Sequence, residues 1–202
     1  LALDIKPYEK LNVDPNMFKE QINNLKAEGF GGINVTVPLK ELAFNISDET
    51  SNVSKKLRSA NTLTLSSDKI NADNTDAVGF INSLEKKTIE ENITNKKTLV
   101  LGAGGSARSV VHALNELGSQ VRLFNRTPEK AAILLNDLSI NSSPVSTEEL
   151  DDYANSSSFI VNTTSLGQKE GEHNNILSFE NIEMETFILS LIHISEPTRR
   201  LI

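Results

Sequence analysis

The chain contains no cysteine among its 202 residues, which excludes a disulfide framework, a thiol nucleophile and a cysteine-based zinc site. Its histidines (His112, His173 and His193) are scattered without the spacing of metal ligands, so we expect no metal site. No apolar run approaches the ~20 residues that a membrane-spanning helix needs, and no signal segment opens the chain. We therefore expect a protein without a membrane association, located in the cytoplasm.

Positive charge is also scarce. Twenty Lys and Arg residues stand against 27 Asp and Glu residues, which gives a net charge of −7. No stripe of Lys and Arg stands out, and this argues against nucleic acid and anionic membranes as partners. A small soluble substrate fits better. The length, with 38% hydrophobic residues, suits one large or two small globular domains.

The first legible element is a helix that begins near Asp14, whose side chain can cap it, with Pro15 in the first turn. Gly29 is expected to end this helix. Three apolar residues at helical spacing share its buried face: Phe18, Ile22 and Leu25.

The stretch "INVTV" (33–37) alternates with period two, which predicts a strand, and Pro38 ends it because proline cannot donate to a β-ladder. Lys40 follows at the start of a short helical turn, at the carboxyl edge of that strand. Open α/β sheets bind their ligands at this edge. The pattern thus places a flexible cation where a substrate would lie.

A second helix is predicted over Asp48 to Leu57, followed by two short strands in residues 60–76 around the turn Ser66 to Asp68. Asp76 lies at the end of this hairpin and close to the start of the next helix, where a carboxylate is favoured. The apolar residues of that helix recur at helical spacing: Ala77, Phe80, Ile81 and Leu84. The polar, charge-mixed residues 87–96 are expected to bury little and to connect two domains.

Residues 96–118, "KKTLVLGAGGSARSVVHALNELG", read as a short apolar strand, a glycine turn and an amphipathic helix closed by Gly118. Gly102, Gly104 and Ala107 match G-x-G-x-x-G/A. The first glycine permits the tight turn, the second lets the backbone approach a pyrophosphate, and the small Ala107 lets the helix pack on the strand. A lone motif of this kind is weak evidence, but the strand before it and the helix after it favour dinucleotide binding at residues 102–106. These five positions are Gly102, Ala103, Gly104, Gly105 and Ser106.

The next strand, "QVRLFNRT", ends in Asn125, Arg126 and Thr127 rather than in the Asp or Glu that bonds the ribose of NAD. A guanidinium and a hydroxyl suit a 2′-phosphate, so the sequence favours NADP over NAD. Lys130 could add positive charge one turn later, or could be an ordinary solvated helix residue. The later strand in "SFIVNTTSLG" ends in a polar turn (Asn162 to Ser165), which is either a plain loop or a wall of the nicotinamide pocket.

These residues together resemble the shikimate dehydrogenase family. Order and spacing agree with the family from about residue 1 to residue 189. Each motif is modest alone, but six in order are specific. The six are "NVTVPLK" (Asn34 to Lys40), "ANTL" (Ala60 to Leu63), "DNTDAVGF" (Asp73 to Phe80), "LGAGGSAR" (Leu101 to Arg108), "NRT" (Asn125 to Thr127) and "NTTSLG" (Asn162 to Gly167).

The resemblance implies an α/β protein with an N-terminal substrate domain over residues 1–86, a linker over 87–96 and a Rossmann-type, doubly wound NADP domain over 97–190. It also implies the reversible reduction of 3-dehydroshikimate to shikimate by NADPH, in aromatic amino-acid biosynthesis. By this analogy Lys40 and Asp76 form the catalytic pair, while Thr36 and Asn61, together with Asp76, hold substrate hydroxyls. We expect a monomer or a homodimer.

The sequence departs from the family at both ends. The family begins with a strand and a Ser-x-Ser segment that binds the substrate carboxylate, and nothing before Leu1 supplies it. The family's later Gly-rich turn, substrate-binding glutamine and returning helices do not appear either. Residues 191–202, within "LIHISEPTRRLI", match no family motif, and we expect a non-native tail of the kind produced by sequencing-adapter read-through.

Three alternatives remain open at this point. The chain could act on another substrate, such as quinate or an aminated relative, or could bind NADP without catalysis. A folate-linked dehydrogenase has a similar two-domain layout and also uses a lysine, although "NRT" (Asn125 to Thr127) argues against it. Without the family resemblance, Lys40 could equally be a surface residue and Asp76 a helix cap.

Overall fold

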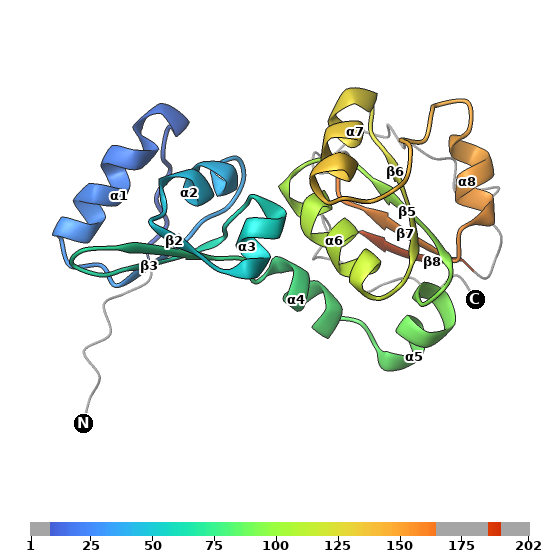
Figure 1. Cartoon of the computed structure of the whole chain (residues 1–202), viewed down its shortest axis with the longest axis horizontal. Coiled ribbons are helices and arrows are strands. Elements are labelled where there is room, and N and C mark those ends of the chain that lie inside the picture. Colours follow the sequence, from blue (N-terminus) through green and yellow to red (C-terminus); the bar gives the residue numbers. More distant parts are fainter. Residues whose placement is uncertain (1–8, 165–185, 191–202) are drawn as a thin grey trace.

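The computed structural model describes residues 9–164 and 186–190 and consists of two α/β lobes that lie side by side (Figure 1). The N-terminal lobe holds the elements that run from blue to teal-green in the figure. They are η1 (Pro15–Met17), α1 (Phe18–Ala27), β1 (Gly32–Asn34), α2 (Lys40–Ile46), β2 (Glu49–Thr50), α3 (Asn52–Leu57), β3 (Thr62–Leu65) and β4 (Ile70–Asp73).

Three short helical elements lead from the first lobe to the second: α4 (Asp76–Asn82), α5 (Lys86–Thr88) and the π-helical turn η2 (Ile89–Ile93). The C-terminal lobe follows. Its elements are β5 (Lys97–Leu101), α6 (Gly105–Glu116), β6 (Gln120–Phe124), α7 (Pro128–Asp137), α8 (Leu150–Ser156), β7 (Phe159–Asn162) and β8 (Phe187–Ser190). In the described part of the chain, no helix is long and apolar enough to cross a bilayer.

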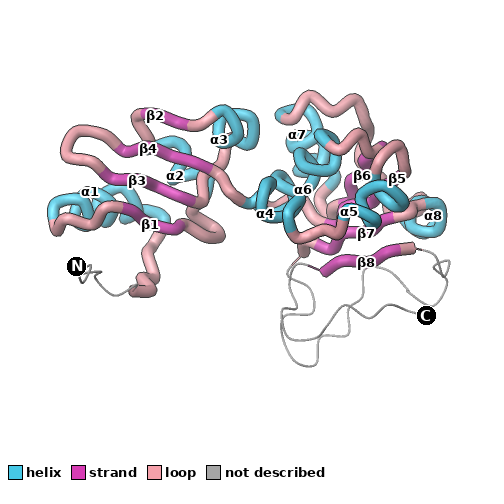
Figure 2. The backbone as a smooth tube through the Cα atoms, turned by 90° about the horizontal axis from the view of Figure 1, so that it is seen from below, coloured by secondary structure: helices cyan, strands magenta, loops and turns pink. Residues whose placement is uncertain are grey.

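The N-terminal lobe contains a mixed four-stranded sheet in the order β1-β3-β4-β2 (Figure 2). β3 runs antiparallel to both of its neighbours, and β2 pairs with β4 in parallel. Helices α1 and α2 cover one face of this sheet. Phe18 and Ile22 of α1 and Ala43 of α2 pack there against Leu63 and Ala72, so the predicted apolar helix face is the one that the sheet buries.

The C-terminal lobe contains a parallel four-stranded sheet in the order β6-β5-β7-β8. A parallel bridge from Phe124 to Val145 extends it beyond β6. Val100 of β5 packs in the same core as α6 and α7, whereas Leu99 and Leu101 pack in a second core with α8. Helices therefore cover both faces of the sheet, which confirms the predicted doubly wound, Rossmann-type fold.

Two predicted elements differ in extent from the structure. The strand predicted over 33–37 ends at Asn34, because the N–H of Leu39 donates to the carbonyl of Thr36 (2.9 Å) and closes a turn. The helix predicted over Asp48 to Leu57 begins only at Asn52. Residues 49–50 form strand β2 instead and pair with β4, and the Asp48 carboxylate next to them accepts the N–H of Ile70 (2.8 Å).

The lobes share an apolar core where α4 packs against α6. Leu57, Ala77 and Phe80 belong to the same buried cluster as Val110 and Leu114 of α6. Buried apolar surface stabilises by about 25 cal/mol per Å², so this shared cluster joins the two lobes. The predicted domain boundary at 87–96 stays a prediction, since α4 already packs on the C-terminal lobe.

Two ion pairs add to the lobe contact, one of them exposed on both sides and the other with a half-buried carboxylate. Arg58 lies 3.6 Å from Asp137, and Lys56 lies 3.4 Å from Glu116. Pairs of this kind are worth about 0–1 kcal/mol each. Burial lowers the pKa of His112 on α6 by more than the neighbouring Glu116 carboxylate raises it, so this imidazole is an uncharged part of the interface near neutral pH.

Residues 87–96 bury more than the sequence predicts. They are largely helical, and Ile93 is fully buried in the core of the C-terminal lobe. We expect Ile93→Ala to lower the free energy of unfolding by about 2–5 kcal/mol, because the substitution leaves a cavity. Urea unfolding measures this change. Ile133→Ala on α7, where the side chain is 58% exposed, is the control, and an equal loss in both variants would contradict the assignment.

Candidate active site

Lys40 and Asp76 form an ion pair in the N-terminal lobe. Lys40 is the first residue of α2 and Asp76 the first residue of α4. The Lys40 ammonium nitrogen donates to Asp76 Oδ2 at 2.7 Å. The two side chains are 12% and 28% exposed, so the pair is shielded yet open enough for a small molecule to reach it.

The second oxygen of the Asp76 carboxylate is bonded as well. Asn61 Nδ2 donates to Asp76 Oδ1 at 2.7 Å and to Thr75 Oγ1 at 3.0 Å. The backbone N–H of Thr75 returns a bond to Asn61 Oδ1 at 3.0 Å. The structure thus brings together three of the four substrate-domain residues predicted from sequence: Lys40, Asn61 and Asp76.

Thr36, the fourth of these residues, lies in the turn that leads into α2. Its side chain is exposed, and its carbonyl accepts the N–H of Leu39 at 2.9 Å. No hydrogen bond among the described residues joins its hydroxyl to Lys40, Asn61 or Asp76. Its predicted contact with substrate stays a prediction.

Backbone bonds explain why Lys40 and Asn61 meet. The N–H of Ala60 donates to the Lys40 carbonyl at 2.9 Å, and the N–H of Val35 donates to the Asn61 carbonyl at 2.7 Å. The start of α2 is therefore fixed to the residues that precede β3. This pairing is long-range, and no local pattern in the sequence signals it.

The glycine turn after β5 has the geometry that its motif predicts. Gly102 has φ +102°, and a Cβ placed there would lie 2.7 Å from Thr163 Oγ1. Thr163 donates to the Leu101 carbonyl twice, from its hydroxyl at 2.7 Å and from its N–H at 2.9 Å. Only glycine fits at position 102, because a side chain would meet both an unfavourable backbone conformation and the Thr163 hydroxyl.

The start of α6 fits a dinucleotide phosphate. Gly104 precedes the helix, and among residues 9–164 and 186–190 no side chain caps it and no atom lies within 4 Å of a Cβ placed at this position. The first N–H groups of a twelve-residue helix are consequently available, and these groups bind pyrophosphate in dinucleotide sites. Ala107 is fully buried, as predicted for the small residue that lets the helix pack on the strand.

The glycine turn and the ion pair lie next to each other, although they belong to different lobes. A Cβ placed on Gly105 would lie 3.8 Å from Cδ of Lys40. The stem of Lys40 thus extends toward the first residue of α6. A nucleotide bound at the glycine turn would therefore lie next to a substrate bound at the Lys40–Asp76 ion pair.

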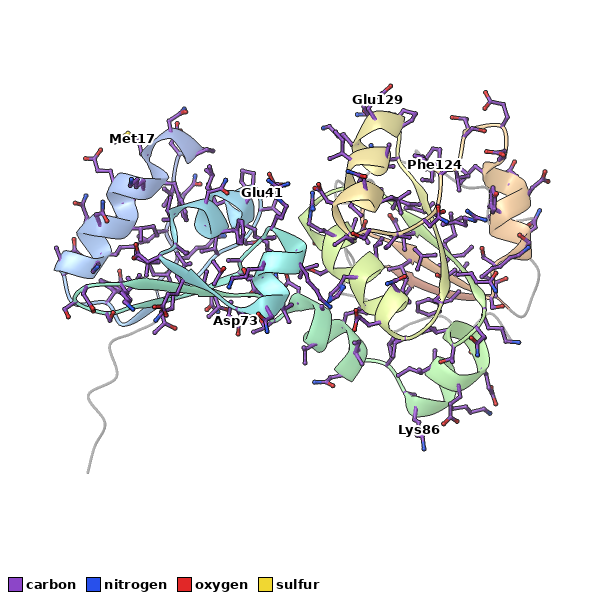
Figure 3. The ribbon with its side chains drawn as sticks, in the orientation of Figure 1. Met17, Glu41, Asp73, Lys86, Phe124 and Glu129 are labelled. Carbon is purple, nitrogen blue, oxygen red and sulfur yellow. The ribbon has the colours of Figure 1, made fainter. Side chains whose placement is uncertain are left out.

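The end of β6 lies beside the same turn. The N–H of Gly102 donates to the Phe124 carbonyl at 2.8 Å. Figure 3 labels Phe124, directly before Asn125, and Glu129, directly before Lys130, and so marks the stretch predicted to recognise a 2′-phosphate. Asn125 Nδ2 donates to the Thr127 carbonyl at 2.8 Å, so the Asn125 side chain shapes this turn. Three side chains remain exposed for a ligand: Arg126, Thr127 and Lys130.

Two groups at the site were not singled out from the sequence. Asn74 and Thr75 hold the backbone and side chains around Asp76. The Asx pattern before a helix could have indicated Asn74. Thr163 was predicted only as part of a polar turn, either a plain loop or a wall of the nicotinamide pocket, whereas in the structure it donates to the Leu101 carbonyl next to the glycine turn. Ser165 and Gly167 of the same motif, His173, His193 and the predicted tail 191–202 lie outside the described residues.

Two α/β lobes that place a lysine–carboxylate pair beside a dinucleotide-type glycine turn define the architecture of two-domain, nucleotide-dependent dehydrogenases. Two family models match the chain: the shikimate dehydrogenase substrate binding domain over residues 3–63, and shikimate/quinate 5-dehydrogenase over residues 83–197. The chain belongs to the shikimate dehydrogenase family, which confirms the resemblance found in the sequence.

Individual relatives agree. Shikimate dehydrogenase (NADP(+)) of Shouchella clausii is 30% identical over 92% of this chain and 68% of its own length. The crystal structure of shikimate dehydrogenase from Aquifex aeolicus is 35% identical, with a TM-score of 0.77 over 88% of this chain and 64% of that one. The Thermus thermophilus enzyme, solved in complex with NADP(H) and shikimate, is 29% identical, with a TM-score of 0.75 over 89% and 65%. The chain thus spans about two thirds of the length of these relatives.

Proposed function

We propose that this chain catalyses the reversible reduction of 3-dehydroshikimate to shikimate with NADPH, a step of aromatic amino-acid biosynthesis, in the cytoplasm. The observation that carries the proposal is the Lys40–Asp76 pair (2.7 Å) beside Gly105 at the start of α6. Family membership supports the substrate, because the curated relatives are named for shikimate and NADP(+).

The chemistry needs a proton and a hydride at one carbonyl group. NADPH, when bound, supplies the hydride to the carbonyl carbon. The Lys40 ammonium donates the proton to the oxygen as charge develops on it, and takes the proton back in the reverse direction. Asp76 holds the ammonium in place through its Oδ2. The residues of this chain therefore provide the acid–base half of the reaction.

The side chains around Asp76 offer a place for a substrate hydroxyl. Both N–H groups of the Asn61 amide are engaged, by Asp76 Oδ1 and by Thr75 Oγ1. A hydroxyl entering between Asn61 and Asp76 would accept from the amide and donate to the carboxylate, replacing a bond of the free protein. Thr36, exposed at the entrance of α2, would bind a second hydroxyl.

The cofactor would lie along the glycine turn and the end of β6. The pyrophosphate would be held by the backbone of the turn, and the 2′-phosphate by side chains after β6. The turn residues are Gly102, Ala103, Gly104, Gly105 and Ser106, and the phosphate-binding group is Asn125, Arg126, Thr127 and Lys130.

Arg126→Gln is expected to raise the dissociation constant of NADPH about tenfold or more and to leave that of NADH unchanged, because a charge-assisted hydrogen bond is worth about 1.5–3 kcal/mol. Fluorescence titration with both nucleotides measures the two constants. Lys87→Gln on α5, a lysine whose side chain is 75% exposed, is the matched control. Equal weakening of NADPH and NADH binding in Arg126→Gln would contradict a role at the 2′-phosphate.

A substrate panel decides between the remaining alternatives. The second family model covers both shikimate and quinate enzymes, so quinate is the alternative with a specific observation behind it. The purified chain would be assayed with NADPH and 3-dehydroshikimate, 3-dehydroquinate or a folate substrate. Turnover of 3-dehydroshikimate alone supports the proposal, and preference for another substrate overturns it. Sedimentation of the same sample tests the expected monomer or homodimer.

A further inference from the structure

Asn74 is a buried polar residue two positions before Asp76, only 2% exposed. Its side chain is bonded at both ends. Asn74 Oδ1 accepts the backbone N–H of Asp76 at 3.0 Å, and Asn74 Nδ2 donates to the Ser59 carbonyl at 3.1 Å. Its own N–H donates to Asp73 Oδ1 at 2.7 Å. The residue therefore spans from the first turn of α4 to the segment between α3 and β3.

That segment, residues 59–61, is also where the other site residues are anchored. The N–H of Ala60 donates to the Lys40 carbonyl at 2.9 Å, and the N–H of Asn61 donates to the Asp73 carbonyl at 3.0 Å. Asn74 thus ties the backbone of Asp76 to the same three residues that fix Lys40 and carry Asn61. The relative position of Lys40 and Asp76 therefore depends on residues 59–61, to which both backbones are linked.

We propose that Asn74 is a positioning residue, which acts through Asp76 by fixing the direction of its carboxylate toward Lys40 and Asn61. The inference rests on the proposed function and deepens it. An Asx turn at the start of a helix also stabilises that helix. A capping role alone would change stability and leave the geometry of the pair intact, whereas a positioning role changes both.

Asn74→Ala removes both side-chain bonds. Its kcat is expected to fall about 10- to 100-fold, since a displacement of about 1 Å in a catalytic group costs up to about 10²-fold. NADPH binding should be unchanged, because the bonds of Asn74 within the described residues go to Asp73, Ser59 and Asp76 and not to the glycine turn. Asn74→Ser keeps an oxygen that can accept the Asp76 N–H but cannot reach the Ser59 carbonyl. Its kcat should therefore lie between those of the wild type and Asn74→Ala. This variant replaces Asn74→Ala in the experiment if the alanine variant does not fold.

The matched control is Asn71→Ala. Asn71 lies on β4 of the same hairpin, and its Oδ1 is buried without a hydrogen-bond partner among the described residues. Its removal should affect stability and not kcat. Comparable kcat losses in the Asn71 and Asn74 variants would show that Asn74 acts only through general stability, and would overturn the proposal.

A second measurement does not depend on turnover. The side-chain amide of Asn61 donates to Asp76 Oδ1, so its ¹⁵N–¹H signals report the position of the carboxylate. These signals should move in Asn74→Ala or Asn74→Ser and stay in place in Asn71→Ala. Unmoved Asn61 signals overturn the positioning role. If the wild-type chain itself shows no turnover, the proposed function fails, and the Asn61 signals still decide the role of Asn74.

Discussion

Lys40→Met is expected to lower the turnover of 3-dehydroshikimate about 10²- to 10⁴-fold, the usual contribution of a positioned general acid. Methionine keeps most of the aliphatic stem, which lies 3.8 Å from a Cβ placed on Gly105, and removes only the ammonium group. NADPH binding and thermal stability should therefore stay close to those of the wild type. Steady-state kinetics together with a nucleotide titration measure both quantities.

The control for this variant is Lys69→Met. Lys69 also forms an ion pair in the N-terminal lobe, with Glu49, but its side chain is 49% exposed. That exposed pair is worth at most about 1 kcal/mol, and turnover should be unaffected by its loss. If Lys40→Met retained normal turnover, or if Lys69→Met lost as much, Lys40 would not be the proton donor.

Gly102→Ala is expected to weaken NADPH binding at least tenfold and to lower stability. The methyl group would lie 2.7 Å from Thr163 Oγ1, at a backbone φ of +102°. Non-glycine residues in such conformations cost about 1–3 kcal/mol. The turn would relax away from β7 and carry the first N–H groups of α6 with it. Nucleotide titration and thermal unfolding measure the two effects.

Alanine substitutions at two other glycines are the comparison variants for Gly102→Ala. In Gly104→Ala the methyl group meets no neighbour within 4 Å in the described part of the chain, so the variant should weaken NADPH binding by blocking the approach of the pyrophosphate and leave stability unchanged. Gly79→Ala in α4 likewise meets no described neighbour and should stabilise by up to about 1 kcal/mol, because alanine favours helix. Unchanged NADPH affinity in Gly102→Ala would show that the turn does not bind the nucleotide.

Local patterns predicted the glycine turn and the helix start at Lys40. In both cases one residue fixes the local conformation. Gly102 is required because φ there is +102°, and Pro38 ends the extended segment before α2. The family resemblance supplied Asn61 and Asp76. The hydrogen bond from Asn61, just before β3, to Asp76, at the start of α4, was not visible in the residues themselves.

The features that the sequence missed depend on partners far along the chain. Thr163 bonds to Leu101, 62 residues away, and Asn74 bonds to Ser59, 15 residues away. The helix predicted from Asp48 starts later for the same reason, because pairing of 49–50 with β4 overrides the local helical pattern. Ile93 was predicted to lie in a polar linker, whereas the π-helical turn η2 buries it in the core.

The most direct test of the proposed function is the consumption of NADPH by the purified chain in the presence of 3-dehydroshikimate, beside an NADH control. The adjacency of the Lys40–Asp76 pair and the glycine turn predicts turnover that is lost in Lys40→Met. The exposed Arg126 and Thr127 after β6 predict that this turnover is faster with NADPH than with NADH. Normal NADPH binding without any consumption of 3-dehydroshikimate would contradict the proposal and leave a nucleotide-binding protein without this activity.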